Sequence, residues 1–231
     1  MHRAPDPEHT AGEVVAYARH ELGADHAGIT LIQRDGDLET VAPTDALVEK
    51  VDRLQYDLGE GPCHDSAWSG ETLVAQNLAD EPRWPRWAPE AVSLGIGSVL
   101  GVELVDKTVG RRMGAVNLYW ARPRVFTSDE VSLAHLITRH AALALAASLN
   151  AEGLQLAMDT RKRIGQAQGI LMERHGLTED QAFAVLRRYS QNNNVKLRDL
   201  AEQLVETKEL PQHPAGRREV EAGGDDSSRQ R

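Results

Sequence analysis

The sequence predicts an α+β protein, in which an antiparallel sheet with flanking helices is followed by a long connector helix and a small three-helix all-α domain. Three observations lead to this prediction. Short apolar segments bounded by Gly, Pro and Asp lie between residues 26 and 120, as is typical of strands. No proline occurs between Ser128 and His175, which favours a long helix. Amphipathic helical spacing then recurs over residues 161–207.

The N-terminal elements follow from local patterns. Residues 1–10 are polar with two prolines, and we expect them to be disordered. A helix is predicted next, closed by Gly23, because one face would carry Val14, Val15, Ala18 and Leu22. Residues 26–33 read as a strand, and Asp35-Gly36 is a hairpin turn signal. The return strand is predicted over residues 38–42.

The middle of the chain alternates helices and strands. Residues 44–54 have helical spacing, and Pro62 suits the first turn of a helix over residues 63–69. A tryptophan-rich loop at residues 82–89 leads into a further short helix. Strands are predicted over residues 71–75, 98–105 and 114–120.

The connector begins at Ser128, and its apolar residues recur without a strict heptad. One long helix or two abutting helices both fit this pattern. A long connector is a natural dimer seam, so we expect a homodimer. The alternative is a domain helix joined to the next domain by a kink near Gly153. After residue 207 the chain is polar, and residues 208–231 are predicted to be disordered.

Charge is unevenly distributed along the chain. The net charge is −9, but residues 1–157 hold 13 basic and 23 acidic residues, whereas residues 161–207 hold 8 basic and 6 acidic ones. The two parts therefore suit different partners. The N-terminal residues lack the apolar core that is typical of a signal peptide, and no segment has the roughly 18 apolar residues that span a bilayer. We expect a cytoplasmic protein without membrane contact.

The C-terminal helices carry the most specific sequence motif of the chain. It consists of Ala167-x-Gly169-Ile170-Leu171-Met172, then Ala182-Phe183, Leu186-Arg187 and Leu197-x-x-Leu200-Ala201. This string resembles the ANTAR domain, the RNA-binding module of bacterial antitermination regulators. The resemblance covers about residues 161–207 and implies binding of RNA stem-loops with short apical loops, which prevents a terminator hairpin from forming.

Candidate RNA contacts follow from the resemblance and from side-chain chemistry. Basic side chains can meet phosphates or stack on bases, and a glycine lets a partner approach closely. The candidates are Gln168, Gly169, Arg187, Arg188, Lys196 and Arg198. The common form of the family has lysine where this chain has Gln168, which removes one cation. For Arg187 and Arg188 the alternative is a solvated helix face. Two other functions remain open, namely a DNA-binding regulator and a protein-interaction signalling regulator.

The N-terminal part resembles a GAF domain. The segments that carry the similarity are DLGEGPCHDSAWSGETLVAQNLADEPRWPRWAPEAVSLGIGSVLGVEL, followed by GAVNLY and Phe126-Thr127. The predicted domains are then a GAF-like sensor at residues 11–149 and an ANTAR-like domain with the connector helix at residues 150–207. Paired in this order, they resemble GAF-ANTAR regulators of the actinobacterial type. The resemblance implies a sensor that commonly binds a small-molecule effector.

Four residues of this part are candidates for a ligand pocket or sensor. Cys63 and His64 suggest a redox thiol or a metal ligand, and Trp84 and Trp87 suggest a pocket wall. The alternative interpretation, which we favour, is that Cys63 packs in the core, His64 lies on the surface and the tryptophans seal the core. Phosphate-binding loops, nucleophile elbows and zinc-protease motifs are absent from the sequence. We therefore expect no enzyme, no metal and no cofactor beyond an unidentified small ligand.

Overall fold

The computed structural model describes residues 6–210 and divides the chain into two compact units. The first unit extends to Leu154 and the second begins at Gln155. The remainder of the predicted disordered tail, residues 211–231, lies outside the described residues, as do residues 1–5. The two units are described in turn.

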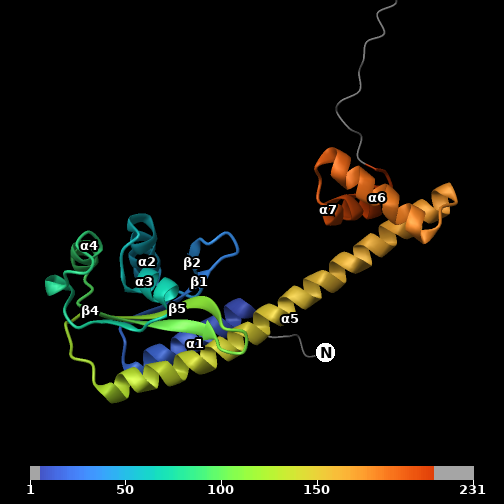
Figure 1. Ribbon diagram of the computed structural model, residues 1–231. Coiled ribbons are helices and arrows are strands. Elements are labelled where there is room, and N and C mark those ends of the chain that lie inside the picture. The colour runs from blue at the N-terminus through green and yellow to red at the C-terminus, as the bar shows by residue number, and fades with distance from the viewer. Residues whose placement is uncertain (1–5, 211–231) are drawn as a thin grey trace, which may run out of the picture. The chain divides into compact units, whose positions relative to one another are not determined.

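The first unit is built on a five-stranded antiparallel sheet (Figure 1). Its strands lie side by side in the order β2-β1-β5-β4-β3, so β1 and β5 pair at the centre although they are distant in sequence. The predicted turn at Asp35-Gly36 joins β1 and β2, and Gly36 adopts a positive φ of 94° there. The strands are β1 (His26–Ile32), β2 (Leu38–Thr40), β3 (Leu73–Ala75), β4 (Ser98–Asp106) and β5 (Arg111–Trp120).

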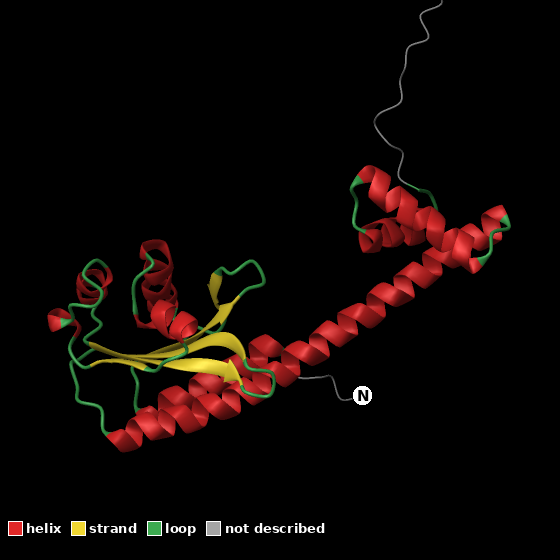
Figure 2. Ribbon diagram, viewed as in Figure 1, coloured by secondary structure: helices red, strands yellow, loops and turns green. Residues whose placement is uncertain are grey.

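Helices cover both faces of this sheet (Figure 2). One face packs against α1 (Pro7–Leu22) and the first part of α5 (Ser128–His175). The other face carries α2 (Ala46–Leu58), α3 (Pro62–Ser69) and α4 (Trp87–Ser93), with a short 3-10 turn, η1 (Leu78–Asp80). The predicted α+β class with an antiparallel sheet and flanking helices is confirmed.

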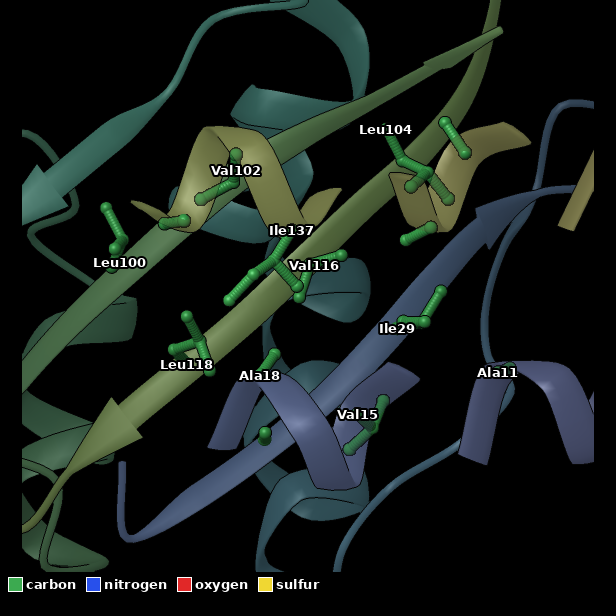
Figure 3. Close-up of a cluster of buried hydrophobic side chains, with 14 of the residues drawn as sticks. Ala11, Val15, Ala18, Ile29, Leu100, Val102, Leu104, Val116, Leu118 and Ile137 are labelled. Carbon is green, nitrogen blue, oxygen red and sulfur yellow. The ribbon is translucent and has the colours of Figure 1, made fainter. Parts of the chain in front are cut away.

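The face toward α1 and α5 is a continuous apolar core (Figure 3). Alternate side chains of β1, β4 and β5 point into it, as the two-residue period of a strand requires. The helices supply small and branched residues that interdigitate with the strand side chains. The labelled members are Ala11, Val15, Ala18, Ile29, Leu100, Val102, Leu104, Val116, Leu118 and Ile137.

The opposite face is crowded by α2 and α3, and two glycines permit this approach. A Cβ placed on Gly28 would lie 2.8 Å from Val48 Cγ1 of α2. A Cβ on Gly101 would lie 3.1 Å from the carbonyl oxygen of Pro62, which opens α3. The helices therefore rest directly on the sheet, and the remaining side chains of that face are brought against them.

The prediction of a disordered N-terminus is wrong for residues 7–10, because α1 begins at Pro7. Pro7 occupies the first helical position, where its missing N–H is no loss. The Asp6 side chain accepts a hydrogen bond from the Glu8 N–H at 3.2 Å and caps the helix. Asp6 and Pro7 are therefore start signals of a helix.

The second unit is a three-helix bundle with a small apolar core. The end of α5 packs with α6 (Glu179–Asn193) and α7 (Leu197–Thr207). Thr178 and Gln181 form the predicted capping box at the start of α6. The buried residues that form this core are Ala167, Leu171, Ala182, Leu186, Leu200, Ala201 and Leu204.

Helix α5 runs from Ser128 to His175 without ending at Gly153, so the alternative of two abutting helices is not observed. Within residues 6–210, it is the one helix whose length and composition would allow it to cross a membrane, with a mean hydropathy of 1.2 over its best window. This is weak evidence, because the core helix of a soluble protein passes the same test. In the first unit α5 buries Ala134, Ala141 and Leu145 against the sheet.

Candidate functional site

A cluster of polar side chains is buried between the sheet and α2 and α3. Most of its members are fully inaccessible to solvent, whereas the opposite face of the sheet is apolar. We call it the polar cluster. Its members are Thr30 of β1, Asp52, Gln55 and Tyr56 of α2, Cys63 of α3, and Asn117 and Tyr119 of β5.

Asp52 is the acidic centre of the polar cluster. The Tyr119 hydroxyl donates a hydrogen bond to its carboxyl group. The Thr40 hydroxyl donates to Asp52 Oδ2 at 2.9 Å, and Gln55 Nε2 donates to Oδ1 at 3.3 Å. Burial disfavours the charged form and raises the pKa of Asp52 to about 6, although the hydrogen bonds from Tyr119 and Thr40 oppose the shift. Asp52 therefore changes charge at a pH closer to neutrality than an exposed aspartate does.

Cys63 lies in the same cluster, at the start of α3. Its Sγ is 2.8 Å from the Thr30 hydroxyl and accepts a hydrogen bond from Asn117 Nδ2 at 2.9 Å. Its backbone N–H donates to Gln55 Oε1 at 2.7 Å. Burial raises the pKa of the Cys63 thiol, and the nearby Asp52 acts in the same direction. A redox thiol needs solvent access and thiolate character, and this setting provides neither.

Asn117 and Tyr56 connect the cluster in two directions. Asn117 Nδ2 also donates to Thr30 Oγ1 at 3.0 Å, while its Oδ1 accepts no hydrogen bond from residues 6–210. The Tyr56 hydroxyl is 2.7 Å from both Thr30 Oγ1 and Thr40 Oγ1. Tyr56 is half-buried, so it joins the buried groups to the surface of α2.

A hollow of about 860 Å³ lies beside Tyr56, between β2 and α2. Its walls carry charges of both signs, and Thr40 and Tyr56 belong to the hydrogen-bond chain that leads to Asp52. A small polar molecule in this hollow would contact the end of that chain. The polar residues of the walls include Thr40, Glu49, Lys50, Arg53, Tyr56 and Asp57.

In the second unit, the candidate RNA contacts on α5 lie beside α6, where Gln168 is half-buried and Gly169 is exposed. Gln168 Nε2 donates a hydrogen bond to the carbonyl oxygen of Glu179 at 3.3 Å, which places this amide next to the first turn of α6. A Cβ on Gly169 would meet no atom within 4 Å. The backbone of α5 is therefore open to a partner at this position.

The candidate cations of α6 and α7 are all exposed. Arg187 and Arg188 point about 100° apart around α6, as consecutive residues of a helix must. Arg198 is 2.9 Å from Asp199 Oδ1 and lies in a hollow of about 580 Å³ between α5 and α7. Lys196 occupies the N-cap position of α7.

Two family models match the chain. The model of the GAF domain matches residues 4–146, and the model of the ANTAR domain matches residues 152–205. The first match covers more than half of the chain. The chain belongs to the GAF domain family. It has a GAF–ANTAR architecture, in which a sensor-type domain precedes a domain of the RNA-binding antitermination regulator family. Such domains are regulatory and serve signal transduction.

Solved structures resemble the GAF part. A domain assigned to a two-component sensor histidine kinase protein of Sinorhizobium meliloti 1021 has 24% identity and a TM-score of 0.54, covering 64% of this chain and 96% of that one. The GAF domain of a phosphoenolpyruvate-protein phosphotransferase from Coxiella burnetii has 20% identity and a TM-score of 0.54, with coverages of 65% and 88%. At these identities the likeness shows the fold alone. A search of curated proteins gave no match.

The other sequence candidates of the GAF domain lie outside the polar cluster. Trp84 and Trp87 are buried, with ring centroids 5.8 Å apart, and they pack in a core cluster with residues of α2, α4 and β4. The Trp84 Nε1 donates to Asp65 Oδ2 at 2.8 Å. His64 is half-buried, and its Nδ1 is 2.9 Å from Asp65 Oδ1. Within residues 6–210 no group of three His, Cys, Asp or Glu side chains is placed to hold a metal ion.

Sequence reasoning missed several residues of these sites. The polar cluster consists of single polar residues inside apolar segments, and Asn117 in GAVNLYW is the plainest signal of this kind. Lys162 and Arg163 share the hollow of Arg198, which only the packing of α5 against α7 reveals. Phe183 of the ANTAR domain is exposed, although the sequence places it between two core positions.

Proposed function

We propose that the protein regulates transcription by binding RNA stem-loops through its ANTAR domain, under the control of its GAF domain. Binding would prevent a terminator hairpin from forming. The observation that carries this proposal is the ANTAR family match over residues 152–205, on a bundle whose cations are exposed. The apical loop of a hairpin is the accessible target, because its bases are unstacked and the major groove of A-form RNA is closed to side chains.

The proposed active form is a homodimer that pairs through α5. Six exposed residues of this helix follow alternating spacings of four and three, which is the pattern of a coiled-coil seam. The leucines of this row are between 49% and 64% exposed, so the GAF core does not use them. The buried residues that face the sheet alternate with this row along the sequence, so the heptad pattern cannot be recognised from the sequence alone. The seam consists of Leu136, His140, Leu143, Ala147, Asn150 and Leu154.

Two features favour a second copy of the chain as the occupant of this seam. Asn150 is a polar residue at a seam position, as is His140, and asparagine there favours pairing with another asparagine in a two-stranded register. An apolar hollow of about 470 Å³ between α1 and α5 adjoins the seam at Leu136 and His140. Sedimentation should therefore give a dimer for the full chain and a monomer for Leu143→Asp.

The GAF domain is the proposed input. A small-molecule effector in the hollow beside Tyr56 would alter the hydrogen bonds that lead to Asp52 and thus the packing of the sheet. Helix α5 packs on that sheet at Ala134, Ile137 and Leu145 and continues in the chain to the ANTAR core at Ala167. A change in its packing would change the dimer and the presentation of two ANTAR domains. Cytoplasmic location and actinobacterial type stay predictions from the sequence.

A competition experiment tests RNA binding against DNA binding. The full chain is titrated with RNA hairpins of randomised apical loop and, separately, with duplex DNA, over a series of salt concentrations. We expect a preference for hairpin RNA, with an affinity that falls as salt rises by a slope of roughly 0.7 to 0.9 per phosphate contacted. A preference for duplex DNA, or an affinity independent of salt, would contradict the proposal.

Paired variants assign the contacts. Arg187→Gln and Arg188→Gln each remove one cation from α6, and we expect the variant that contacts phosphate to show a smaller salt slope. Arg34→Gln is the matched control, because Arg34 is an exposed arginine of the GAF domain. If the double variant Arg187→Gln/Arg188→Gln keeps full hairpin affinity, α6 is not the RNA surface. A protein-interaction function would leave hairpin binding absent in every variant.

A further inference from the structure

Phe183 is an aromatic residue that the ANTAR fold leaves partly exposed. It is 38% exposed and lies outside the buried core cluster, whereas its neighbour Ala182 and the next-turn residue Leu186 are fully buried. The unit has one other aromatic ring, Tyr189, which is half-buried and packs against the core. The buried core of the bundle therefore forms without the Phe183 ring, part of which stays open to solvent.

The surroundings of Phe183 are polar and open on one flank of α6. Glu179 and Arg187 lie four residues before and after it, so the three side chains form one stripe. A helical side chain leans toward the N-terminus, which directs the ring over the turn that starts at Glu179. Gln168 of α5 donates its hydrogen bond to the Glu179 carbonyl oxygen, so its amide borders the same turn. The adjacent Gly169 has open space where a side chain would lie.

Neither the ring nor the cation beside it is engaged within residues 6–210. Phe183 takes part in no aromatic pair and has no cation over its face. Arg187 forms no salt bridge and no side-chain hydrogen bond there, in contrast to Arg198, which is paired with Asp199. A free ring face and a free guanidinium, with an amide beside the first turn of α6, together match an unstacked nucleobase with its phosphate.

We infer that Phe183 is a stacking platform for one base of the apical loop, and that Arg187 contacts the phosphate next to that base. This inference rests on the proposed function and names the recognition element within it. It also separates the two arginines of α6. Arg187 shares the stripe of the ring, whereas Arg188 points about 100° away from Arg187. Of the two, Arg187 is the one that contacts RNA at this site.

A protein partner fits this surface less well than RNA. Protein interfaces have an apolar centre of several residues, and Phe183 is the one exposed large hydrophobic residue of α6. The residues around it on the stripe are charged. The seam residues Leu136, Leu143 and Leu154, by contrast, form an extended apolar row on α5. Docking to a protein or to a second copy is thus assigned to the seam, and the Phe183 stripe is assigned to RNA.

The test uses the full chain and one hairpin selected by the wild-type protein from a library with a constant stem and a randomised apical loop. Phe183→Leu keeps an apolar side chain but removes the π face, and we expect a loss of affinity of roughly 5- to 150-fold. Phe183→Tyr and Phe183→Trp keep a ring and should keep the affinity. Met158→Ala is the matched control, because Met158 is an exposed apolar residue of the same unit that lies off the seam.

Salt dependence separates stacking from charge. Phe183→Leu should leave the salt slope unchanged, since stacking releases no counterion, whereas Arg187→Gln should lower the slope by roughly 0.7. Equal affinity of wild type and Phe183→Leu would overturn the inference while leaving the proposed function intact. So would an altered oligomeric state of Phe183→Leu, because it would assign the ring to a protein contact. Failure of the wild-type chain to select any hairpin would overturn the proposed function itself, and this inference with it.

Discussion

The two domains differ in where their functional polar side chains lie, which is in the interior of the GAF domain and on the surface of the ANTAR domain. The GAF domain buries Asp52, Gln55 and Asn117 completely, inside a fold whose other sheet face is apolar. The buried residues of the ANTAR core are all alanine and leucine, and its cations and Phe183 lie outside. The same chain thus builds one domain with polar groups held away from water and another with polar groups presented to a partner.

This difference reflects two tasks with different physical requirements. A buried polar network is sensitive to its neighbours, because the low dielectric strengthens each hydrogen bond and makes each unpaired group costly. It can therefore report a change at its edge, where Tyr56 lines the hollow beside α2. A nucleic-acid surface needs exposed cations on a stable support, and a compact aliphatic core supplies that support. Measurements of the free energy of unfolding of each domain should distinguish the buried polar network of the GAF domain from the aliphatic core of the ANTAR domain.

The largest effect is expected from the ANTAR core. Leu186→Ala removes a fully buried side chain from a cluster of seven buried residues, which should lower the free energy of unfolding of this domain by about 2–5 kcal/mol. All four tryptophans, at positions 68, 84, 87 and 120, lie in the GAF domain. The unfolding transition followed by tryptophan fluorescence should therefore stay as in the wild type. The part of the helical circular dichroism transition that comes from the ANTAR domain should shift to milder denaturing conditions. Equal shifts of both signals would show that the two domains unfold as one.

The GAF domain is expected to show a pH dependence that comes from Asp52. Folding raises the pKa of this carboxyl from 3.8 to about 6, so the folded state holds a proton that the unfolded chain has lost in that range. This raised pKa contributes about 3 kcal/mol to the free energy of unfolding. The contribution is fully present below pH 3.8 and is lost as the pH rises through about 6. The fluorescence transition of the wild type should fall accordingly between pH 4 and 7.

Asp52→Asn removes this titration and should flatten the profile over the same range. The stability of the variant at neutral pH should then lie closer to its stability at acid pH than in the wild type. Asp57→Asn is the matched control on α2, because Asp57 is exposed and should leave the wild-type profile unchanged. A profile of Asp52→Asn that keeps the wild-type decline would show that another group of the GAF domain titrates there.

The fold was largely predictable from the sequence, and the reasons are local. Strand alternation, the Asp35-Gly36 turn and the glycine after α1 specify their own backbone geometry. The error at residues 7–10 came from treating prolines as signs of disorder, although Pro7 at the first helical position initiates a helix. Local signals thus located the elements, and one was misread because proline has opposite effects inside and at the start of a helix.

The sites were less predictable, because their members come from distant segments. Thr30, Cys63 and Asn117 meet through the pairing of β1 with β5 and the docking of α3, which no short window of sequence contains. Lys162 and Arg198 share a hollow for the same reason. Asn117 did carry a signal, since a lone amide inside an apolar strand must find partners when it is buried. Phe183 also carried a signal, since it lies off the apolar stripe of α6 that Ala182 and Leu186 define.

The smallest of these effects concerns the support of the RNA surface. Thr178 caps α6 by accepting a hydrogen bond from the Gln181 N–H at 3.3 Å, and Gln181 Oε1 accepts one in return from the Thr178 N–H at 3.0 Å. Thr178→Ala removes the first of these and should destabilise the ANTAR domain by about 0.5–2 kcal/mol, whereas Thr178→Ser should retain the cap. The helical circular dichroism transition measures the stability of both variants.

Because α6 carries Phe183 and Arg187, a cap that only stabilises the bundle should leave hairpin affinity unchanged below the unfolding transition. A loss of affinity in Thr178→Ala at temperatures where the domain is folded would instead show that the first turn of α6, which Gln168 contacts at Glu179, belongs to the RNA surface itself.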